Sequence, residues 1–424
     1  MESILLEDNP HWIDINAYSH YIERRVLKKA TKFLKTKEIL AILGARRVGK
    51  STLAKLLIKS LLKEVNPKNI FFINLEKPEF IPYKNNPIYL EKIYESYLKL
   101  ANPNTKQKIY FFLDEVQIFN NWEVFVKSKF ENSNIKFIIT GSNSSLLESN
   151  YASLLTGRVI KLLLYPFNFL EFLDYKNIDY STKLSQIANK IEIQRAKDEY
   201  LKWGGYFSVI SNSDELIKKE YLKNIAEDII LKDIVPRYRI KNSTEIKDMF
   251  FYLASNATTY LNYSKLSKKI GIDAKMIKEY IEYFKYNYLI STISEFHTKL
   301  ALQIKSTKKL YLNDNGFLNL GINRAKNQGI FLENMVFNLL NQAYNEDIYY
   351  LKEKQEIDFV VEDFLLQVSY DIEDEKTKKR EIEAFKNYKG KKILITYSSN
   401  NEDLKDIEII SIENFIFKYC MDKI

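Results

Sequence analysis

The sequence is poor in the residues that build disulfides and zinc sites. Cys420 is the only cysteine, so an intrachain disulfide is excluded and a cysteine metal cluster cannot form. The 3 histidines, His11, His20 and His297, lie far apart and lack the spacing of metal ligands. With 11 Gly and 8 Pro in 424 residues, long flexible linkers are not expected either.

Long hydrophobic runs are also missing. The longest apolar stretch, residues 159–170, contains Lys161, Pro166 and Asn168, which make it too polar to span a bilayer. Residues 1–8 are acidic and lack the apolar length of a signal peptide. We therefore expect no membrane association and a cytoplasmic location.

Apolar and basic residues, by contrast, are abundant. Apolar residues make up 46% of the chain, enough for the cores of two or three domains. The net charge of +9 favours an acidic partner such as nucleic acid, but only weakly, because the lysines are scattered along the chain.

The strongest motif is the octapeptide Gly44-Ala45-Arg46-Arg47-Val48-Gly49-Lys50-Ser51, which fits the P-loop pattern G-x-x-x-x-G-K-[ST]. An apolar run precedes it at residues 38–43, and a segment with helical apolar spacing follows from Thr52. Strand, glycine loop and helix are the order that phosphate binding requires, because the loop N–H groups and the helix N-terminus face the anion. Lys50 is expected to reach the β- and γ-phosphates, and Ser51 to ligate Mg²⁺.

A second apolar run, residues 108–115, ends in two acids, as the Walker B strand of such proteins does. Asp114 is expected to hold Mg²⁺, and Glu115 to polarise the attacking water. Alone, the pattern would fit a strand followed by a polar turn equally well. The P-loop upstream favours the functional interpretation.

A third apolar run, residues 134–143, carries Thr140, Ser142 and Asn143 at its end. Ligands of parallel sheets bind at the carboxyl ends of the strands, so these side chains are expected to face the γ-phosphate. Farther along, Arg158 has two interpretations. It acts on the γ-phosphate, in cis or in trans, or it is an ordinary surface arginine in a salt bridge.

These motifs together resemble one family. The P-loop is followed by Leu113-Asp114-Glu115-Val116-Gln117 with Trp122, by Thr140-Gly141-Ser142-Asn143-Ser144-Ser145-Leu146-Leu147, by Gly157-Arg158, and by Pro166-Phe167-Asn168-Phe169-Leu170-Glu171-Phe172. In that order they resemble archaeal and bacterial AAA-type ATPases with a C-terminal nuclease-like domain.

The resemblance implies that Glu115 is the catalytic glutamate and that Ser142 or Asn143 is the sensor. It also implies an extra strand between Walker A and Walker B, which residues 70–76 fit. The chain has no N-K-x-D motif for guanine and no L-S-G-G-Q signature of transporter ATPases, so ATP with Mg²⁺ is the expected ligand.

Residues 166–240 have a helical pattern, which by resemblance is a lid on the nucleotide domain. Residues 241–325 predict a winged helix, with helices at 263–270 and 274–286 and wing strands at 289–293 and 308–312. The exposed face of the second helix mixes lysines with glutamates, so DNA contact and a structural or protein-docking role are both open. Lys268 and Lys269 are the better phosphate candidates.

Residues 326–424 resemble the PD-(D/E)xK nuclease core. Glu333 and Asp358 match its acidic positions, but Gln367 and Ser369 stand where that core has glutamate and lysine. A neutral amide is a poor Mg²⁺ ligand, so we expect a degenerate site without cleavage activity. Lys352, Lys354 or Lys376 are candidates to replace the missing lysine.

The prediction is an α/β protein whose P-loop NTPase parallel sheet (residues 1–165) is followed by a helical lid (166–240), a winged-helix domain (241–325) and a small α/β nuclease-like domain (326–424). Its expected function is ATP hydrolysis that switches a nucleic-acid partner, DNA in particular, or a protein partner. The alternatives are an ATP-gated protein scaffold with little turnover and an ATP-dependent DNA nuclease. The resemblance suggests ring oligomers, although Arg158 does not itself demand a neighbouring subunit.

Overall fold

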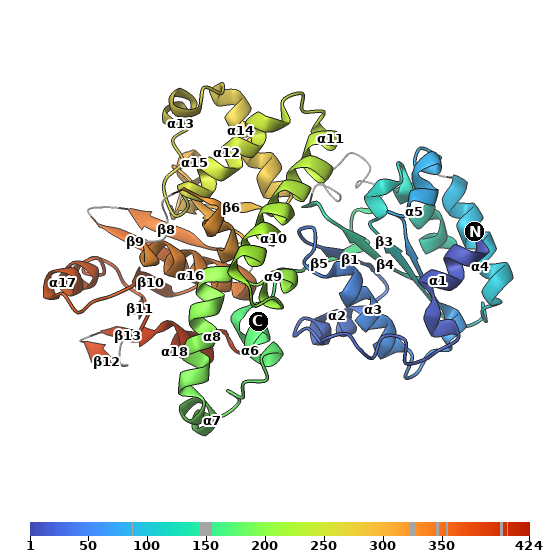
Figure 1. Ribbon diagram of the computed structural model, residues 1–424, viewed down its shortest axis with the longest axis horizontal. Helices are drawn as coiled ribbons and strands as arrows, with labels where there is room; N and C mark the ends of the chain where they lie inside the picture. The colour runs from blue at the N-terminus through green and yellow to red at the C-terminus, as the bar shows by residue number, and fades with distance from the viewer. Residues whose placement is uncertain are drawn as a thin grey trace. The chain divides into compact units, whose positions relative to one another are not determined.

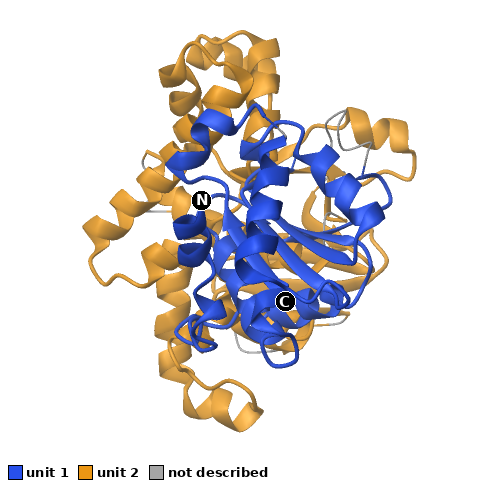
Figure 2. Cartoon of the chain, turned by 90° about the vertical axis from the view of Figure 1, so that its right-hand side faces the viewer, with its two compact units in different colours: residues 1–165 blue, residues 166–424 orange. Residues whose placement is uncertain are grey.

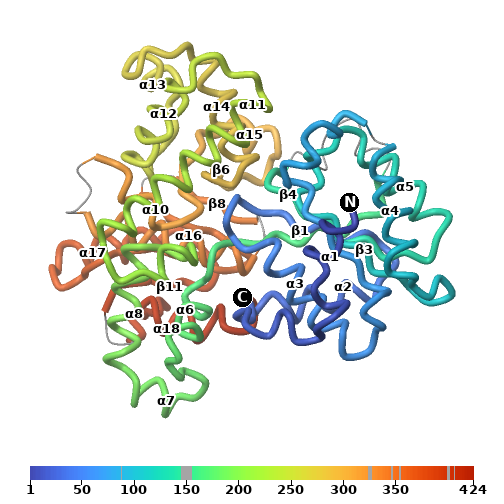
Figure 3. The backbone as a smooth tube through the Cα atoms, turned by 45° about the vertical axis from the view of Figure 1, so that its right-hand side comes forward, coloured from blue at the N-terminus to red at the C-terminus, as the bar shows by residue number. Residues whose placement is uncertain are grey.

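The computed structural model describes residues 1–86, 88–144, 155–322, 327–344, 347–352, 355–398, 402–404 and 406–424. They form two compact units, residues 1–165 and 166–424, which Figure 2 colours separately. The chain passes from the first unit to the second once, and Figure 3 lets this path be followed from blue to red. Among the described residues, no helix combines the length and the apolar character needed to cross a membrane.

The first unit is built on a five-stranded parallel sheet in the order β2-β3-β4-β1-β5 (Figure 1). Its strands are β1 (Ile39–Leu43), β2 (Ile70–Asn74), β3 (Ile109–Asp114), β4 (Ile135–Gly141) and β5 (Val159–Leu163). The apolar runs in the sequence predicted the first four, because parallel strands are covered on both faces and are therefore continuously apolar. The predicted parallel-sheet α/β fold is confirmed.

The strand predicted at residues 70–76, between the two Walker motifs in the sequence, is present. It forms β2 at the edge of the sheet, paired only with β3. The strand that separates the P-loop strand β1 from the Walker B strand β3 is β4. Sequence order does not fix sheet order when the connections are crossovers.

The helices of the first unit are α1 (Glu2–Asp8), α2 (Leu27–Leu34), α3 (Lys50–Leu61), α4 (Ile88–Ala101) and α5 (Trp122–Asn132). The segment before α2 folds inward as turns, where Tyr18 and Arg24 are buried. Its side chains form hydrogen bonds with other parts of the unit, as between the Tyr18 hydroxyl and His11 Nδ1 at 3.0 Å.

The second unit begins with helices, as the pattern of residues 166–240 predicts. They are α6 (Phe169–Tyr175), α7 (Lys183–Ala188), α8 (Lys190–Trp203), α9 (Phe207–Ile210), α10 (Glu215–Asp228) and α11 (Val235–Tyr238). Asn168 starts α6 with a reciprocal capping box: its side chain accepts from the Glu171 N–H, and the Glu171 carboxylate accepts from the Asn168 N–H. These helices belong to the same compact unit as the rest of residues 166–424.

Next come α12 (Ser243–Ser255), α13 (Tyr263–Ile270), α14 (Ala274–Tyr286), β6 (Ile290–Glu295), α15 (Leu300–Lys305) and β7 (Lys309–Leu312). Asp273 caps α14 by accepting from the Lys275 N–H at 2.8 Å. β6 and β7 pair antiparallel. The predicted helix pair and strand pair are thus present.

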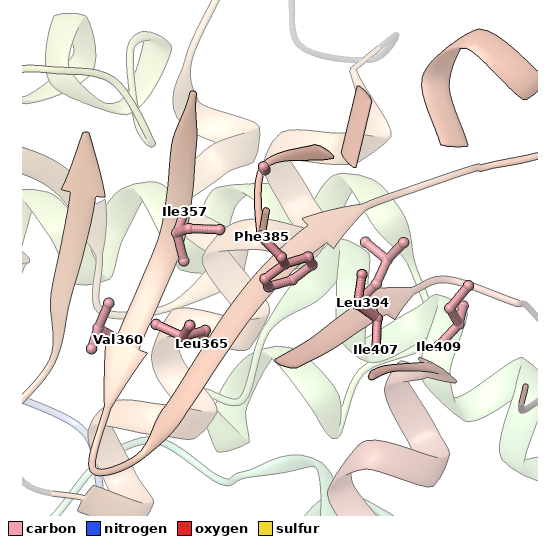
Figure 4. Close-up of a cluster of buried hydrophobic side chains, with 8 residues drawn as sticks. Ile357, Val360, Leu365, Phe385, Leu394, Ile407 and Ile409 are labelled. Atoms are coloured by element: carbon pink, nitrogen blue, oxygen red, sulfur yellow. The ribbon is translucent and has the colours of Figure 1, made fainter. Parts of the chain in front are cut away.

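A mixed eight-stranded sheet, in the order β12-β13-β11-β10-β9-β8-β6-β7, runs through the rest of the unit. Its further elements are α16 (Gln328–Tyr344), β8 (Tyr349–Lys352), β9 (Glu356–Val361), β10 (Phe364–Ser369), α17 (Glu375–Glu383), β11 (Lys391–Thr396), β12 (Glu402–Leu404), β13 (Ile407–Ser411) and α18 (Ile412–Phe415). The parallel pairing of β6 with β8 joins the strand pair β6–β7 to this sheet. Figure 4 shows part of its core, which gathers Ile357, Val360, Leu365, Ala384, Phe385, Leu394, Ile407 and Ile409.

Candidate functional site

The P-loop lies at the carboxyl end of β1 and leads into α3, as predicted. Gly44 must be glycine because a Cβ there would lie 2.2 Å from the Leu164 carbonyl oxygen. Gly49 has a left-handed φ of 97° immediately before the first residue of α3. The loop therefore brings bare backbone to the N-terminus of a 12-residue helix, where N–H groups are available to an anion.

Lys50 is folded back onto the loop that precedes it. Its buried ammonium donates to the Ala45 carbonyl oxygen at 3.1 Å. The same ammonium lies 3.2 Å from Glu115 Oε1 at the end of the neighbouring Walker B strand. The lysine predicted to bind phosphate and the predicted catalytic glutamate are thus an ion pair in this structure.

Ser51 and Asp114 are brought together as the Mg²⁺ prediction requires. The Ser51 hydroxyl donates to Asp114 Oδ2 at 2.7 Å, and the Thr140 hydroxyl donates to Oδ1 at 2.6 Å. Burial, with the nearby Glu115 carboxylate, raises the pKa of Asp114 to about 6. An alcohol and a carboxylate oxygen side by side are ligands that suit Mg²⁺, so the residues fit the ion.

Glu115 is held by three neighbours. Its backbone adopts a left-handed φ of 53°, and its N–H donates to the Thr140 hydroxyl at 2.9 Å. The Gln117 amide donates to Glu115 Oε2. Burial would raise the pKa of Glu115, but the Lys50 ammonium and the Gln117 amide outweigh it, and the pKa is lowered. The carboxylate is therefore an oriented, ionised base.

Gln117 also connects the Walker B segment to the end of β4. Its Nε2 donates to the Ser142 hydroxyl at 3.2 Å. Ser142 and Asn143 are both buried at this edge of the sheet. Gln117 Oε1 is buried and makes no hydrogen bond within the described part of the chain.

The remaining predicted phosphate-binding residues, Arg46, Arg47, Val48 and Thr52, are fixed by the protein around them. Arg46 forms an ion pair with Glu76 at 2.9 Å, Arg47 has a positive φ of 67°, and Thr52 is half-buried in the first turn of α3. The carbonyl oxygen of Val48 accepts a bond of 3.1 Å from Arg24, whose other guanidinium nitrogen donates to the Tyr165 carbonyl at 3.0 Å.

Arg158 lies next to β5, the edge strand at the opposite side of the sheet from β2. It immediately precedes β5, and its carbonyl accepts from the N–H of Ile39, the first residue of β1. The P-loop follows the last residue of β1, about 13 Å farther along the strand. The Arg158 guanidinium forms an ion pair with Glu131 at 3.1 Å. The structure thus shows Arg158 in a salt bridge, as one of its two interpretations expects, and action on the γ-phosphate, in cis or in trans, stays a prediction.

Two contributors to this site were missed by the sequence prediction. The role of Gln117 could have been inferred from the sequence, since it stands two residues after Glu115 in the segment that carries the resemblance. The sequence carries no such signal for Arg24, because it lies in a turn segment 24 residues before Val48. The last residues of the predicted sensor segment, 145–147, lie outside the described residues.

The structure brings together three of the four residues of the predicted nuclease-like site. Asp358 of β9 and Gln367 of β10 meet, because the Asp358 N–H donates to Gln367 Oε1 at 3.3 Å. Glu333 of α16 lines the same cavity. Ser369 does not, and its hydroxyl donates to the Asp371 carbonyl instead.

The lysine at this cavity was not predicted. It is Lys309 of β7. Lys352 lies over the Tyr260 ring at 3.9 Å, Lys376 does not line the cavity, and Lys354 lies outside the described residues. The proposed replacement by Lys352 or Lys376 is therefore wrong.

The P-loop, the Walker B acids and the parallel sheet define the first unit as an AAA-type P-loop ATPase domain, a class that binds nucleotide together with Mg²⁺. Comparison with known families agrees: residues 36–173 match the model described as AAA domain. Residues 194–328 match a domain of unknown function, DUF8612.

The whole chain has relatives of similar length. It is 34% identical to the uncharacterized protein MJ1544 of Methanocaldococcus jannaschii, covering 89% of this chain and 86% of that protein. It is 30% identical to an uncharacterized protein of Haemophilus influenzae, covering 94% of this chain and 98% of that protein. The chain belongs to the family of these two proteins.

Among solved structures, the Walker-type ATPase paby2304 of Pyrococcus abyssi matches with a TM-score of 0.41 and 16% identity. The match covers 71% of this chain and 96% of that one.

Proposed function

We propose that the chain is a Mg²⁺-dependent ATPase. The observation that carries the proposal is the hydrogen-bonded group of Lys50, Ser51, Asp114 and Glu115, which places a phosphate-binding cation, two Mg²⁺ ligands and a base next to one another. Bound Mg²⁺ would neutralise charge on the phosphates. Ser51 and Asp114 would hold it, and Lys50 would bind the phosphates.

Hydrolysis then depends on Glu115. A phosphate competes for the Lys50 ammonium that now pairs with Glu115, so nucleotide binding frees the carboxylate from this ion pair. Gln117 keeps one carboxylate oxygen in place through its Nε2. The oxygen of the attacking water bonds to the γ-phosphorus while the bond to the ADP oxygen breaks, and Glu115 accepts one proton of that water. Gln117 Oε1, which makes no hydrogen bond among the described residues, is placed to accept a hydrogen bond from the water's other O–H group.

We assign the partner to nucleic acid, bound through the α12–β7 segment as a winged helix. Lys268 and Lys269 of α13 are exposed, and so is Lys275 at the start of α14. The acid Glu282, which would repel phosphate, forms an ion pair with Lys285 at 2.9 Å. Of the two acids on α14, Glu279 and Glu282, the second is thus neutralised, and three exposed lysines are offered to a phosphate backbone.

The ATPase rate with and without duplex DNA, single-stranded DNA and RNA tests this assignment. We expect one of them to stimulate hydrolysis. The double substitution Lys268→Ala/Lys269→Ala should remove the stimulation and leave the basal rate unchanged. The matched control Lys219→Ala/Lys223→Ala removes the same charge from exposed positions of α10. Unstimulated hydrolysis with all three nucleic acids would point to a protein partner instead.

The C-terminal elements support a nuclease-like core. Their order α16-β8-β9-β10-α17-β11 places Asp358 and Gln367 on neighbouring strands, with Glu333 on the preceding helix. We propose no cleavage activity for it, because its predicted Mg²⁺ ligands are engaged otherwise.

A further inference from the structure

The second unit contains a polar cavity of about 410 Å³. It is lined by side chains from five elements: Lys309 of β7, Glu333 of α16, Glu356 and Asp358 of β9, Gln367 of β10, and Glu381 of α17. Carboxylates dominate this list, and a nuclease-like core would use such carboxylates to hold a divalent ion.

The centre of the carboxylates is filled by the Lys309 ammonium. Its Nζ lies 2.8 Å from Glu333 Oε1, 2.5 Å from Glu356 Oε1 and 3.2 Å from Asp358 Oδ1. Only 4% of the Lys309 side chain is exposed. An ammonium has three N–H donors, so three carboxylates match its whole donor capacity.

A divalent ion does not fit this arrangement. Mg²⁺ requires oxygen atoms at about 2.0–2.1 Å and Ca²⁺ at about 2.3–2.6 Å, in shells of six or more. The carboxylate oxygens here stand at hydrogen-bond distance from a nitrogen that occupies their common centre. Within the described ranges, no group of three or more His, Cys, Asp or Glu side chains is arranged to hold a metal.

The remaining candidate ligand, Gln367, is also engaged within the protein. Its Oε1 accepts from the Asp358 N–H at 3.3 Å, and its Nε2 donates to Glu381 Oε2 at 2.8 Å. Glu381 is in turn paired with Arg380. Neither the amide nor the fourth carboxylate is left to complete a coordination shell.

We infer that Lys309 is the resident cation of this cavity and takes the place of a divalent ion. The wing strand β7 supplies the ammonium, while α16 and β9 supply the carboxylates, so the cavity ties the strand pair β6–β7 to the C-terminal core. The inference rests on the proposed nuclease-like core and is independent of the ATPase site. Its failure would leave the proposed ATPase function untouched.

Mn²⁺ binding to the nucleotide-free full chain, followed by electron paramagnetic resonance of the free ion, tests the inference. The wild type and Asp358→Asn should bind the same number of Mn²⁺ ions. Lys309→Met removes the ammonium at similar side-chain length and should gain one ion, with a melting temperature that rises when Mn²⁺ is added. Lys309→Met/Asp358→Asn should lose the gained ion.

Lys308→Met is the matched control. Lys308 neighbours Lys309 in sequence, but its ammonium donates to Ser294 Oγ at 2.8 Å and to the Gln303 carbonyl at 2.9 Å, away from the carboxylates. Lys308→Met should therefore bind Mn²⁺ as the wild type does. Any background site at the P-loop is shared by all these variants and cancels in the comparison.

Two results would overturn the inference. One is a wild-type Mn²⁺ ion that disappears in Asp358→Asn, since the cavity would then hold a metal beside Lys309. The other is a folded Lys309→Met protein that gains no ion. If Lys309→Met does not fold, the comparison of wild type with Asp358→Asn decides alone: equal Mn²⁺ binding supports a metal-free cavity, and unequal binding contradicts it.

Discussion

Thr140 connects both Walker B acids to the neighbouring strand, and Thr140→Val tests how much that connection contributes. The hydroxyl donates to Asp114 Oδ1 at 2.6 Å and accepts from the Glu115 N–H at 2.9 Å. The side chain is 1% exposed, and valine has nearly the same volume, so the substitution removes two hydrogen bonds without opening a cavity.

The expected loss follows from these two bonds. A hydrogen bond to a charged group contributes about 1.5–3 kcal/mol, and a buried N–H left without a partner costs about 1–3 kcal/mol. The added methyl group offsets about 1 kcal/mol of this. The free energy of unfolding should therefore fall by about 1.5–5 kcal/mol. The Thr140 bond also lowers the pKa of Asp114 against the effect of burial, so its removal should weaken Mg²⁺ binding.

Urea unfolding of the nucleotide-free chain at pH 7.5, where Asp114 is ionised, measures the first effect. Tryptophan fluorescence reports on the first unit through Trp12 and Trp122 and on the second through Trp203, whose contribution is the same in both variants. The Mg²⁺ concentration that half-saturates ATP hydrolysis measures the second. Thr31→Val is the control, because the Thr31 hydroxyl donates to the Leu27 carbonyl of its own helix α2 at 2.8 Å, and the substitution should change stability by less than about 0.5 kcal/mol. Equal values for Thr140→Val and Thr31→Val in both assays would refute the reasoning.

Three further predictions concern the same unit. Gln117→Ala should lower kcat by roughly 10- to 100-fold with little change in the KM for ATP, because it removes a bond of about 1.5–3 kcal/mol that orients Glu115; an unchanged kcat would contradict this. Gly44→Ala should abolish ATP binding, because the Cβ would overlap the Leu164 carbonyl at 2.2 Å. Gly157→Ala has nothing within 4 Å of its Cβ, so it should keep ATP binding, although its left-handed φ of 74° should cost some stability; equilibrium dialysis with ATP compares the two. Burial lowers the pKa of His11 from 6.5 to about 4, so between these values the unfolded chain binds a proton that the folded chain does not. Stability should therefore fall as pH drops from 6.5 to 4, by up to about 3 kcal/mol, and His11→Gln should flatten this part of the unfolding curve against pH.

The parts of the fold that were predictable depend on local sequence patterns. β1, β2, β3 and β4 are covered on both faces, so each is a short apolar run. The P-loop is a contiguous motif, and Asp273 caps α14 from the position that its side-chain chemistry indicates. In each case the residues that decide the structure lie next to one another in the sequence.

The parts that were missed depend on contacts between distant segments. Lys309 reaches Asp358 across 49 residues and had no neighbouring motif to mark it. Arg24 lies in a turn segment before α2 and donates to the Val48 carbonyl of the P-loop, 24 residues farther along the chain. The position of Arg158 also depends on a contact between distant segments, because β5, which begins at the next residue, pairs with β1.

The central claim is that the P-loop site hydrolyses ATP with Glu115 as its base. The most direct test measures ATP binding and ATP turnover side by side in wild type, Glu115→Gln and Lys50→Ala. Glu115→Gln should bind Mg·ATP as tightly as the wild type and hydrolyse it at least about 100-fold more slowly, while Lys50→Ala should lose binding. Hydrolysis by Glu115→Gln at the wild-type rate would contradict the account.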